Sequence, residues 1–201
     1  MANTNRPFGA RPVRYLNGNP WNGVGRPYYA ASTYATAFYI GDPVVIDGTS
    51  NAAEFQGFQA GTLPGLAIGV AGSPITGFVI GVQPVTRAST VYRAASTEAV
   101  VFVCDDPDVI FQVQDDGGGS LGTTTVGLNA QLISGSGSTT TGRSGWAMDG
   151  GTTTAPGSNS GYQLFIIGAA NIANNDVTSD YAVWEVILNE QTFRPNVGVG
   201  I

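Results

Sequence analysis

Residues 92–110 read Tyr92-Arg-Ala-Ala-Ser-Thr-Glu-Ala-Val-Val-Phe-Val-Cys-Asp-Asp-Pro-Asp-Val-Ile110, and residues 28–46 match them at an offset of 64 without a gap. Both copies share the pattern Tyr-x-Ala-Ala-Ser-Thr-x-Ala-x-x-Phe-x-x-x-Asp-Pro-x-Val-Ile. In this pattern an apolar strand follows small residues. Asp-Pro then makes a corner, because proline fixes φ and aspartate accepts hydrogen bonds from nearby amides. β-Branched residues begin a second strand. Two such strand–turn–strand units predict an all-β fold.

The repeat also predicts a topology. A duplicated hairpin places similar elements at related positions of a β-barrel or a two-sheet sandwich. We therefore expect Phe38 and Phe102 to be buried alike, and Asp42-Pro43 and Asp106-Pro107 to form corners between strands. The alternative is that the same strand chemistry arose twice at unrelated positions.

Further strand candidates are rich in β-branched and aromatic residues and are bounded by Gly, Pro, Asn or Asp. They are Leu66–Val70, Gly77–Gln83, Gln131–Ser134, Tyr162–Gly168 and Tyr181–Asn189. Residues 135–142 and 150–157 consist largely of Gly, Ser and Thr, and these segments are typical of surface loops. A single helical turn is expected within Gly119–Leu128.

Charged residues make up 11% of the chain, against about 25% in an ordinary soluble domain. Such a surface is either built from neutral polar groups or covered by partners, which favours a protein packed among others. The chain contains neither His nor Lys, which excludes catalysis by a Ser-His-Asp triad, by a Cys-His pair or through a lysine Schiff base. Zinc sites lack their usual ligands as well. We expect a structural protein without enzymatic activity, catalytic residues or a cofactor.

Carboxylates are concentrated around one candidate strand, Val109–Gln114. They are Asp105, Asp106, Asp108, Asp115 and Asp116. Calcium takes several carboxylate oxygens, so a calcium site is one interpretation, although the spacing differs from an Asp-x-Asp-x-Asp-Gly loop. A pair of these aspartates acting as a glycosidase is another, but no substrate cleft is marked. We favour a third, in which the aspartates end the strand and protect it against edge pairing.

The apolar runs 99–104 and 164–167 are far shorter than the roughly 18 residues of a membrane-spanning helix, so no membrane partner is expected. The first seven residues lack the apolar core of a signal peptide. The single cysteine, Cys104, lies in an apolar run and is interpreted as a small buried hydrophobe, with a reactive or intermolecular thiol as the alternative.

Charge is distributed unevenly along the chain. Residues 1–41 carry four arginines and no acidic residue, a formal charge of +4, whereas residues 42–201 carry −10. Residues 1–26 are rich in Pro, Gly and Asn, which oppose a helix, yet they contain aromatic residues that a disordered tail would lack. We therefore divide the chain into an extended N-terminal docking arm (1–26), a β-rich body (27–192) and a C-terminal tail (193–201).

The arm is expected to bind a partner or a neighbouring copy of the chain. The residues assigned to this contact are Arg6, Phe8, Arg11, Arg14, Tyr15, Trp21 and Arg26. The alternative is that the arm folds back on its own body. Nucleic acid is not an expected partner, because the acidic body would repel phosphate.

Several short motifs resemble the capsid decoration, or cement, proteins of tailed bacteriophages. They are Met1-Ala-Asn-x-x-Arg-Pro-x-Gly-x-Arg-Pro-Val13, Tyr15-Leu-Asn-Gly18, Trp21-Asn-Gly23, Tyr92-Arg-Ala-Ala-Ser-Thr97, Asp105-Asp-Pro-Asp108 and Gly127-Leu-Asn129. The resemblance covers most of residues 1–190 and rests on structural rather than catalytic motifs. The tail Phe193–Ile201 has no counterpart in it.

The resemblance implies β-rich subunits, commonly trimers, made in the host cytoplasm and bound to the exterior of an icosahedral phage head. Their partners would be the major capsid protein and neighbouring copies, and they would stabilise the head by bridging capsid subunits. Self-association as a homotrimer is also expected from the neutral surface, since closed symmetry covers strand edges.

Two other functions stay open. One is a carbohydrate- or receptor-binding module on a virion or cell surface, suggested by Trp21, Trp146 and Trp184, although each tryptophan could instead pack in the core. The other is a minor tail or connector protein of the same virion.

Overall fold

The computed structural model describes residues 3–194 and confirms the all-β fold. Five strands form a closed barrel in the order β2-β4-β3-β5-β6. These strands are β2 (Arg26–Ala30), β3 (Pro43–Ser50), β4 (Pro64–Ile68), β5 (Gly77–Val82) and β6 (Ala99–Cys104). All neighbours in the barrel are antiparallel except β2 and β4, which are parallel.

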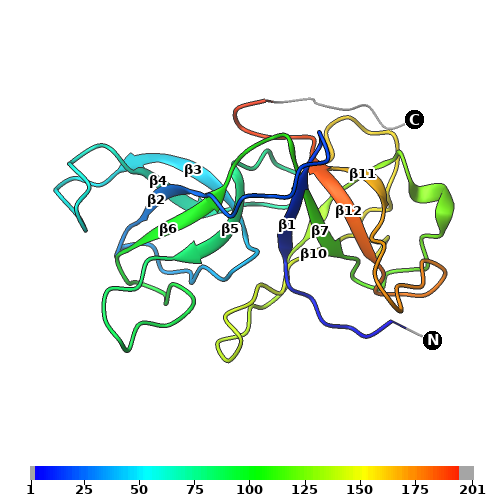
Figure 1. Ribbon diagram of the computed structural model, residues 1–201, viewed down its shortest axis with the longest axis horizontal. Helices are drawn as coiled ribbons and strands as arrows, with labels where there is room; N and C mark the ends of the chain where they lie inside the picture. Colours follow the sequence, from blue (N-terminus) through cyan, green and yellow to red (C-terminus); the bar gives the residue numbers. More distant parts are fainter. Residues whose placement is uncertain (1–2, 195–201) are drawn as a thin grey trace.

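A five-stranded antiparallel sheet lies beside the barrel, with the order β1-β7-β12-β11-β8 (Figure 1). Its strands are β1 (Ala10–Tyr15), β7 (Val109–Gln114), β8 (Asn129–Ala130), β11 (Leu164–Ala169) and β12 (Val183–Leu188). A short ladder joins β9 (Leu132–Ile133) to β10 (Ala147–Met148), and one 3₁₀ turn, η1, spans Thr123–Thr125. The strand candidates and the single helical turn expected from the sequence are thus confirmed. No helix in the described residues is long and apolar enough to cross a membrane.

Two apolar clusters fill the molecule. One fills the barrel and includes Tyr28, Phe38 and Leu66, and the other covers the sheet and includes Phe111 and Trp184. The ring of Phe78, from barrel strand β5, lies 4.9 Å from that of Phe111 in β7, so the two units share a packed junction. Each large apolar side chain buried in this way stabilises the fold by about 1.5–3 kcal/mol.

The duplicated hairpin is not confirmed. Tyr28 lies in β2, whereas its counterpart Tyr92 lies outside the strands. Phe38 is fully buried, but Phe102 is only half-buried, so the prediction of equal burial is wrong. The reason is alternation along β6: Val101 and Val103 point into the barrel, which turns Phe102 outward.

Both Asp-Pro corners are present, but they lie in different parts of the fold. Asp42 accepts a hydrogen bond from the backbone N–H of Tyr39 at 2.8 Å and directly precedes β3, inside the barrel. Asp106 accepts one from the N–H of Asp108 at 2.9 Å and precedes β7. The second corner therefore carries the chain from the barrel to the sheet, which the repeat could not reveal.

The N-terminal segment differs from the expected separate arm. Strand β1 pairs with β7 from Ala10↔Val113 to Tyr15↔Val109, and Arg26 already belongs to β2. Nearer the terminus, Arg6 donates its backbone N–H to the side chain of Gln114 at 2.8 Å. The segment therefore folds on its own body, the alternative left open by the sequence. Of the expected tail 193–201, residues 195–201 lie outside the described residues.

Candidate functional site

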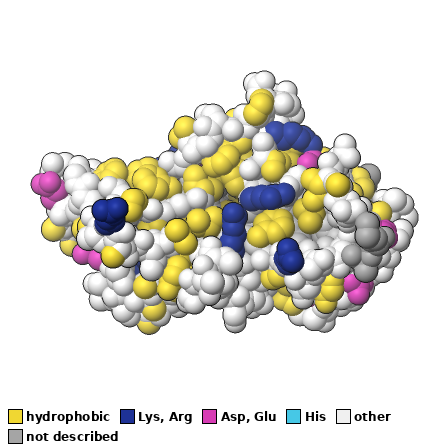
Figure 2. Space-filling model, turned by 60° about the horizontal axis from the view of Figure 1, so that its bottom comes forward, with side chains coloured by type: hydrophobic (Ala, Val, Ile, Leu, Met, Phe, Trp, Pro, Cys, Tyr) yellow, Lys and Arg dark blue, Asp and Glu magenta, His cyan; other side chains and the backbone are white. Residues whose placement is uncertain are grey.

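The seven residues assigned to docking are divided between two surfaces. Arg6, Phe8, Arg11 and Arg14 lie on or just before β1. Arg143, which sequence reasoning missed, joins them from a different segment of the chain, which is bridged to Ile40. We call these five residues the arginine face. Tyr15, Trp21 and Arg26 instead line a cleft between the barrel and the sheet. Figure 2 shows arginine side chains gathered among apolar ones on one face of the molecule.

Two neighbouring side chains hold Arg11 of the arginine face in place. Its Nε and Nη2 both donate to Oε1 of Gln112, at 3.1 and 2.7 Å, because Arg11 and Gln112 are cross-strand partners of β1 and β7. Its guanidinium also lies over the Phe8 ring, 5.0 Å from the centroid. The side chain is exposed yet held in one orientation, so a partner would not have to order it.

A cross-strand row of polar side chains continues from Arg11. Gln112 donates to Oε1 of Glu185 at 3.3 Å, and Arg14 forms an ion pair with the same carboxylate. Gln112 and Glu185 are again cross-strand partners, in β7 and β12. Glu185 therefore neutralises one arginine of the face, and Arg11 is oriented through a neutral amide.

Arg143 reaches the face through its neighbours in the chain. Residue 143 forms a parallel bridge with Ile40, and Gly41 in turn accepts a hydrogen bond from the N–H of Ala10 at 3.0 Å. Arg6, Arg11 and Arg143 are exposed, and no carboxylate of the described residues forms an ion pair with them. The face therefore presents uncompensated positive charge on a chain of net charge −6.

The cleft has a volume of about 780 Å³. Tyr15 lines it from the end of β1, and Trp21 and Val24 line it from the β1–β2 connection. Residues 104–107 line it from the end of β6 and the corner that follows, and Phe193 from the C-terminal segment. Three of the exposed large apolar side chains lie in or beside it: Leu16 (46%), Val24 (67%) and Phe193 (50%). Distant parts of the chain, including three of the motifs that carry the resemblance, thus meet at the cleft.

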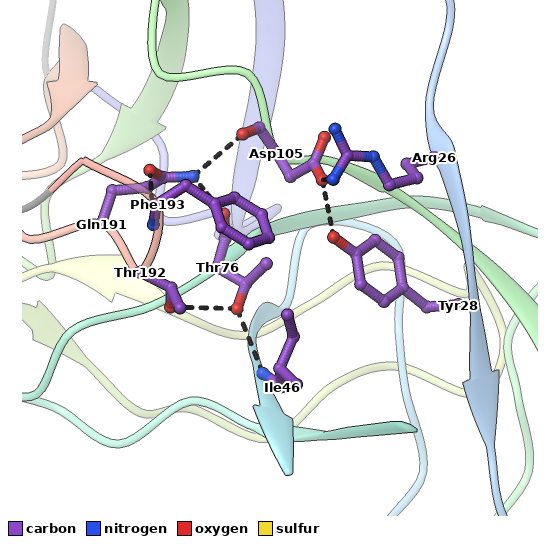
Figure 3. Close-up of polar contacts among 8 residues, drawn as sticks. All are labelled: Arg26, Tyr28, Ile46, Thr76, Asp105, Gln191, Thr192 and Phe193. Atoms are coloured by element: carbon purple, nitrogen blue, oxygen red, sulfur yellow. Dashed lines mark hydrogen bonds and ion pairs between the residues drawn. The ribbon is translucent and has the colours of Figure 1, made fainter. Parts of the chain in front are cut away.

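Asp105 is the polar centre of the cleft. Its Oδ2 accepts a hydrogen bond from the Tyr28 hydroxyl at 2.6 Å and lies 3.2 Å from Nη1 of Arg26 (Figure 3). Burial and the neighbouring carboxylate raise the pKa of Tyr28, which keeps this hydroxyl a donor. The Phe193 ring lies 5.5 Å from the Arg26 guanidinium. A carboxylate and a guanidinium are therefore held side by side at the cleft wall.

The C-terminal segment fixes this arrangement. Gln191 is fully buried, and its Nε2 donates to the backbone oxygens of Thr76 and Asp105, both at 2.9 Å. Its Oε1 accepts from the N–H of Phe193 at 3.1 Å. Arg194 pairs with Asp108 at 2.5 Å. Phe193 and Asp105 are thus tied to each other through one buried amide.

Asp115, which follows β7, has a structural role in the fold. Asp115 accepts hydrogen bonds from the N–H of Tyr181 at 2.7 Å and from the indole of Trp184 at 3.1 Å. In the part of the chain that the structure describes, no group of three or more acidic or cysteine side chains is arranged to hold a metal ion. The strand ends where the sequence predicted, at Val109 and Gln114. Protection against edge pairing is wrong as a reason, because β7 lies between β1 and β12.

The tryptophans and the cysteine are mostly core residues. Trp184 is fully buried and Trp146 is 7% exposed, so Trp21 alone of the three is partly open to solvent. Cys104 is buried, as the sequence predicted, and burial raises the pKa of its thiol to about 12. The thiol therefore stays protonated and unreactive at neutral pH.

No family model matches this chain, no curated protein matches it, and no solved structure matches it. What the chain does is therefore inferred from its own residues and their geometry. Those residues offer two surfaces, a cationic face over β1 and an amphipathic cleft beside β2.

Proposed function

We propose that this protein is a capsid decoration protein, which binds the exterior of a phage head and stabilises it by bridging capsid subunits. The motifs that resemble decoration proteins support this assignment, as do the low charge and the absence of His and Lys from the sequence. In this role the chain is not an enzyme, and its partners are the major capsid protein and neighbouring copies in a homotrimer.

The arginine face is the single observation that carries the docking part of the proposal. Arg6, Arg11 and Arg143 are exposed without an ion pair from the described residues, although the chain as a whole is acidic. Uncompensated cations on an acidic protein favour an acidic partner and set the orientation of docking. The partner surface on the shell should therefore be rich in carboxylates.

The test is binding to purified phage heads that lack this protein, measured by co-sedimentation at low and high salt. Replacing Arg6, Arg11 and Arg143 together by Ala should weaken binding about tenfold or more at low salt, and the difference should shrink as salt screens the contact. Arg87→Ala is the matched control, because Arg87 is exposed but lies outside this face. Equal binding of the triple variant at low salt would contradict docking through this face.

A further inference from the structure

The cleft beside β2 combines features that suit one class of small molecule. Its volume of about 780 Å³ is within the roughly 300–1,000 Å³ of typical ligand sites. Aromatic side chains line part of it, while Asp105 and Arg26 supply charged hydrogen-bonding groups. A ligand for this cleft needs an apolar face and a polar edge.

Trp21 supplies the apolar platform. It is the partly exposed tryptophan, and it packs against the core cluster of the sheet, which holds its ring in place. Beside it, the Tyr15 hydroxyl donates to Oδ1 of Asn22 at 3.0 Å. This bond leaves the amide nitrogen of Asn22 to donate toward a ligand. A flat aromatic ring flanked by an amide matches a pyranose, whose C–H face is apolar and whose edge carries hydroxyls.

Asp105 and Arg26 supply the partners for those hydroxyls. Oδ2 of Asp105 is engaged by Tyr28 and Arg26, while Oδ1 takes no hydrogen bond from the described residues. The Arg26 side chain is 58% exposed and faces the same cleft. Hydrogen bonds to charged groups are strong, and Gln191 and Phe193 fix the pair in advance. Because the two charges cancel, a neutral ligand fits better than an ion.

We propose that this cleft is a binding site for a neutral saccharide unit, with Trp21 as the stacking platform and Asp105 and Arg26 as hydroxyl partners. This activity is separate from docking through the arginine face, which lies over β1. The protein would then carry a second function, holding its particle to glycans.

The test uses the full chain and a panel of neutral tetrasaccharides built from glucose, galactose, mannose or N-acetylglucosamine. Binding is followed by tryptophan fluorescence and by amide chemical shifts. At least one sugar should give a saturable fluorescence change, with shifts confined to the residues of the cleft. Trp21→Ala should weaken binding about tenfold or more. Asp105→Asn, which keeps the hydrogen bond to Tyr28 possible, should weaken it as well.

The arginine-face triple variant is the matched control and should bind the same sugar as tightly as the unmodified protein. Conversely, Trp21→Ala should still bind phage heads, so the two proposals fail independently. No saturable binding to any sugar of the panel overturns the saccharide site. Binding that survives both cleft variants, or shifts that map to the arginine face, overturns it too.

Discussion

Asp42 shows how one buried side chain makes stability depend on pH. Its carboxyl is 3% exposed, between the barrel corner and the loop that carries Ser144, and desolvation raises its pKa from 3.8 to about 6. The folded state therefore binds the proton more tightly than the unfolded state does. The stabilisation is complete only well below the ordinary pKa of 3.8, and it is lost as the pH rises from there through about 6.

Asp42→Asn should remove this dependence. Relative to the unmodified protein, the free energy of unfolding of the variant should rise by about 2 kcal/mol between pH 4 and pH 7. Urea denaturation at a series of pH values measures it. Asp176→Asn is the control. Hydrogen bonds from Thr178 lower the pKa of Asp176, so its difference from the unmodified protein should stay nearly constant between pH 4 and pH 7 and should change, with the opposite sign, only below pH 4. A difference between Asp42→Asn and the unmodified protein that is the same at both pH values would show that Asp42 does not titrate as described.

Arg93 has a structural role that residue patterns alone could not reveal. The repeat gave it no role, yet it is 1% exposed and donates to the backbone oxygens of Ala31, Tyr34, Thr36 and Thr97. Burial lowers its pKa, and the four carbonyls compensate for the missing carboxylate. Its counterpart in the first copy is Tyr29, so comparing the copies gave no signal for this contact.

At the scale of elements, the position of β1 depends on close contact between Gly9 and Gly41. A Cβ on Gly9, whose φ is +69°, would lie 2.2 Å from the carbonyl oxygen of Gly41. Gly9 thus allows the N-terminal segment to pass close to the barrel corner and enter the sheet. Gly9 in the motif Arg6-Pro-x-Gly9 is therefore explained by close backbone packing on the chain's own body.

Gly9→Ala should consequently destabilise the protein by about 3 kcal/mol or more, since backbone must move in addition to the strain of positive φ. Gly18→Ala is the matched comparison, because Gly18 has a φ of +88° but open space where a Cβ would be. It should cost only about 1 kcal/mol. Equal losses in the two variants, measured by urea denaturation, would mean that the contact with Gly41 is not tight.

Strands were predictable where alternation and turn residues agreed, as at Gly77–Val82 and Val183–Leu188. Pairing was not, because it depends on contacts between distant residues. The segments 28–46 and 92–110 share local chemistry, but Phe38 pairs with Arg93 of the other copy, outside the strands. Local residues determine the two Asp-Pro corners, whereas tertiary contacts determine which strands the following segments pair with.

At the scale of the whole molecule, charge is segregated. The sequence showed the cationic N-terminal segment, so Arg6, Arg11 and Arg14 of the arginine face were predictable from it. Arg143 could not be added from the sequence, because its place depends on the bridge to Ile40. Likewise, nothing local linked Phe193 to Arg26 across more than 160 residues. The cleft was therefore invisible before the fold was known.

Imaging purified phage particles by electron cryomicroscopy tests the central claim most directly. We expect density for this protein on the exterior of the head, with β1 and the arginine face toward the shell and neighbouring copies in contact as trimers. Such density should be missing from heads that lack the protein and return when it is added. Density at the tail or connector, or no density on the shell at saturating protein, would contradict the assignment.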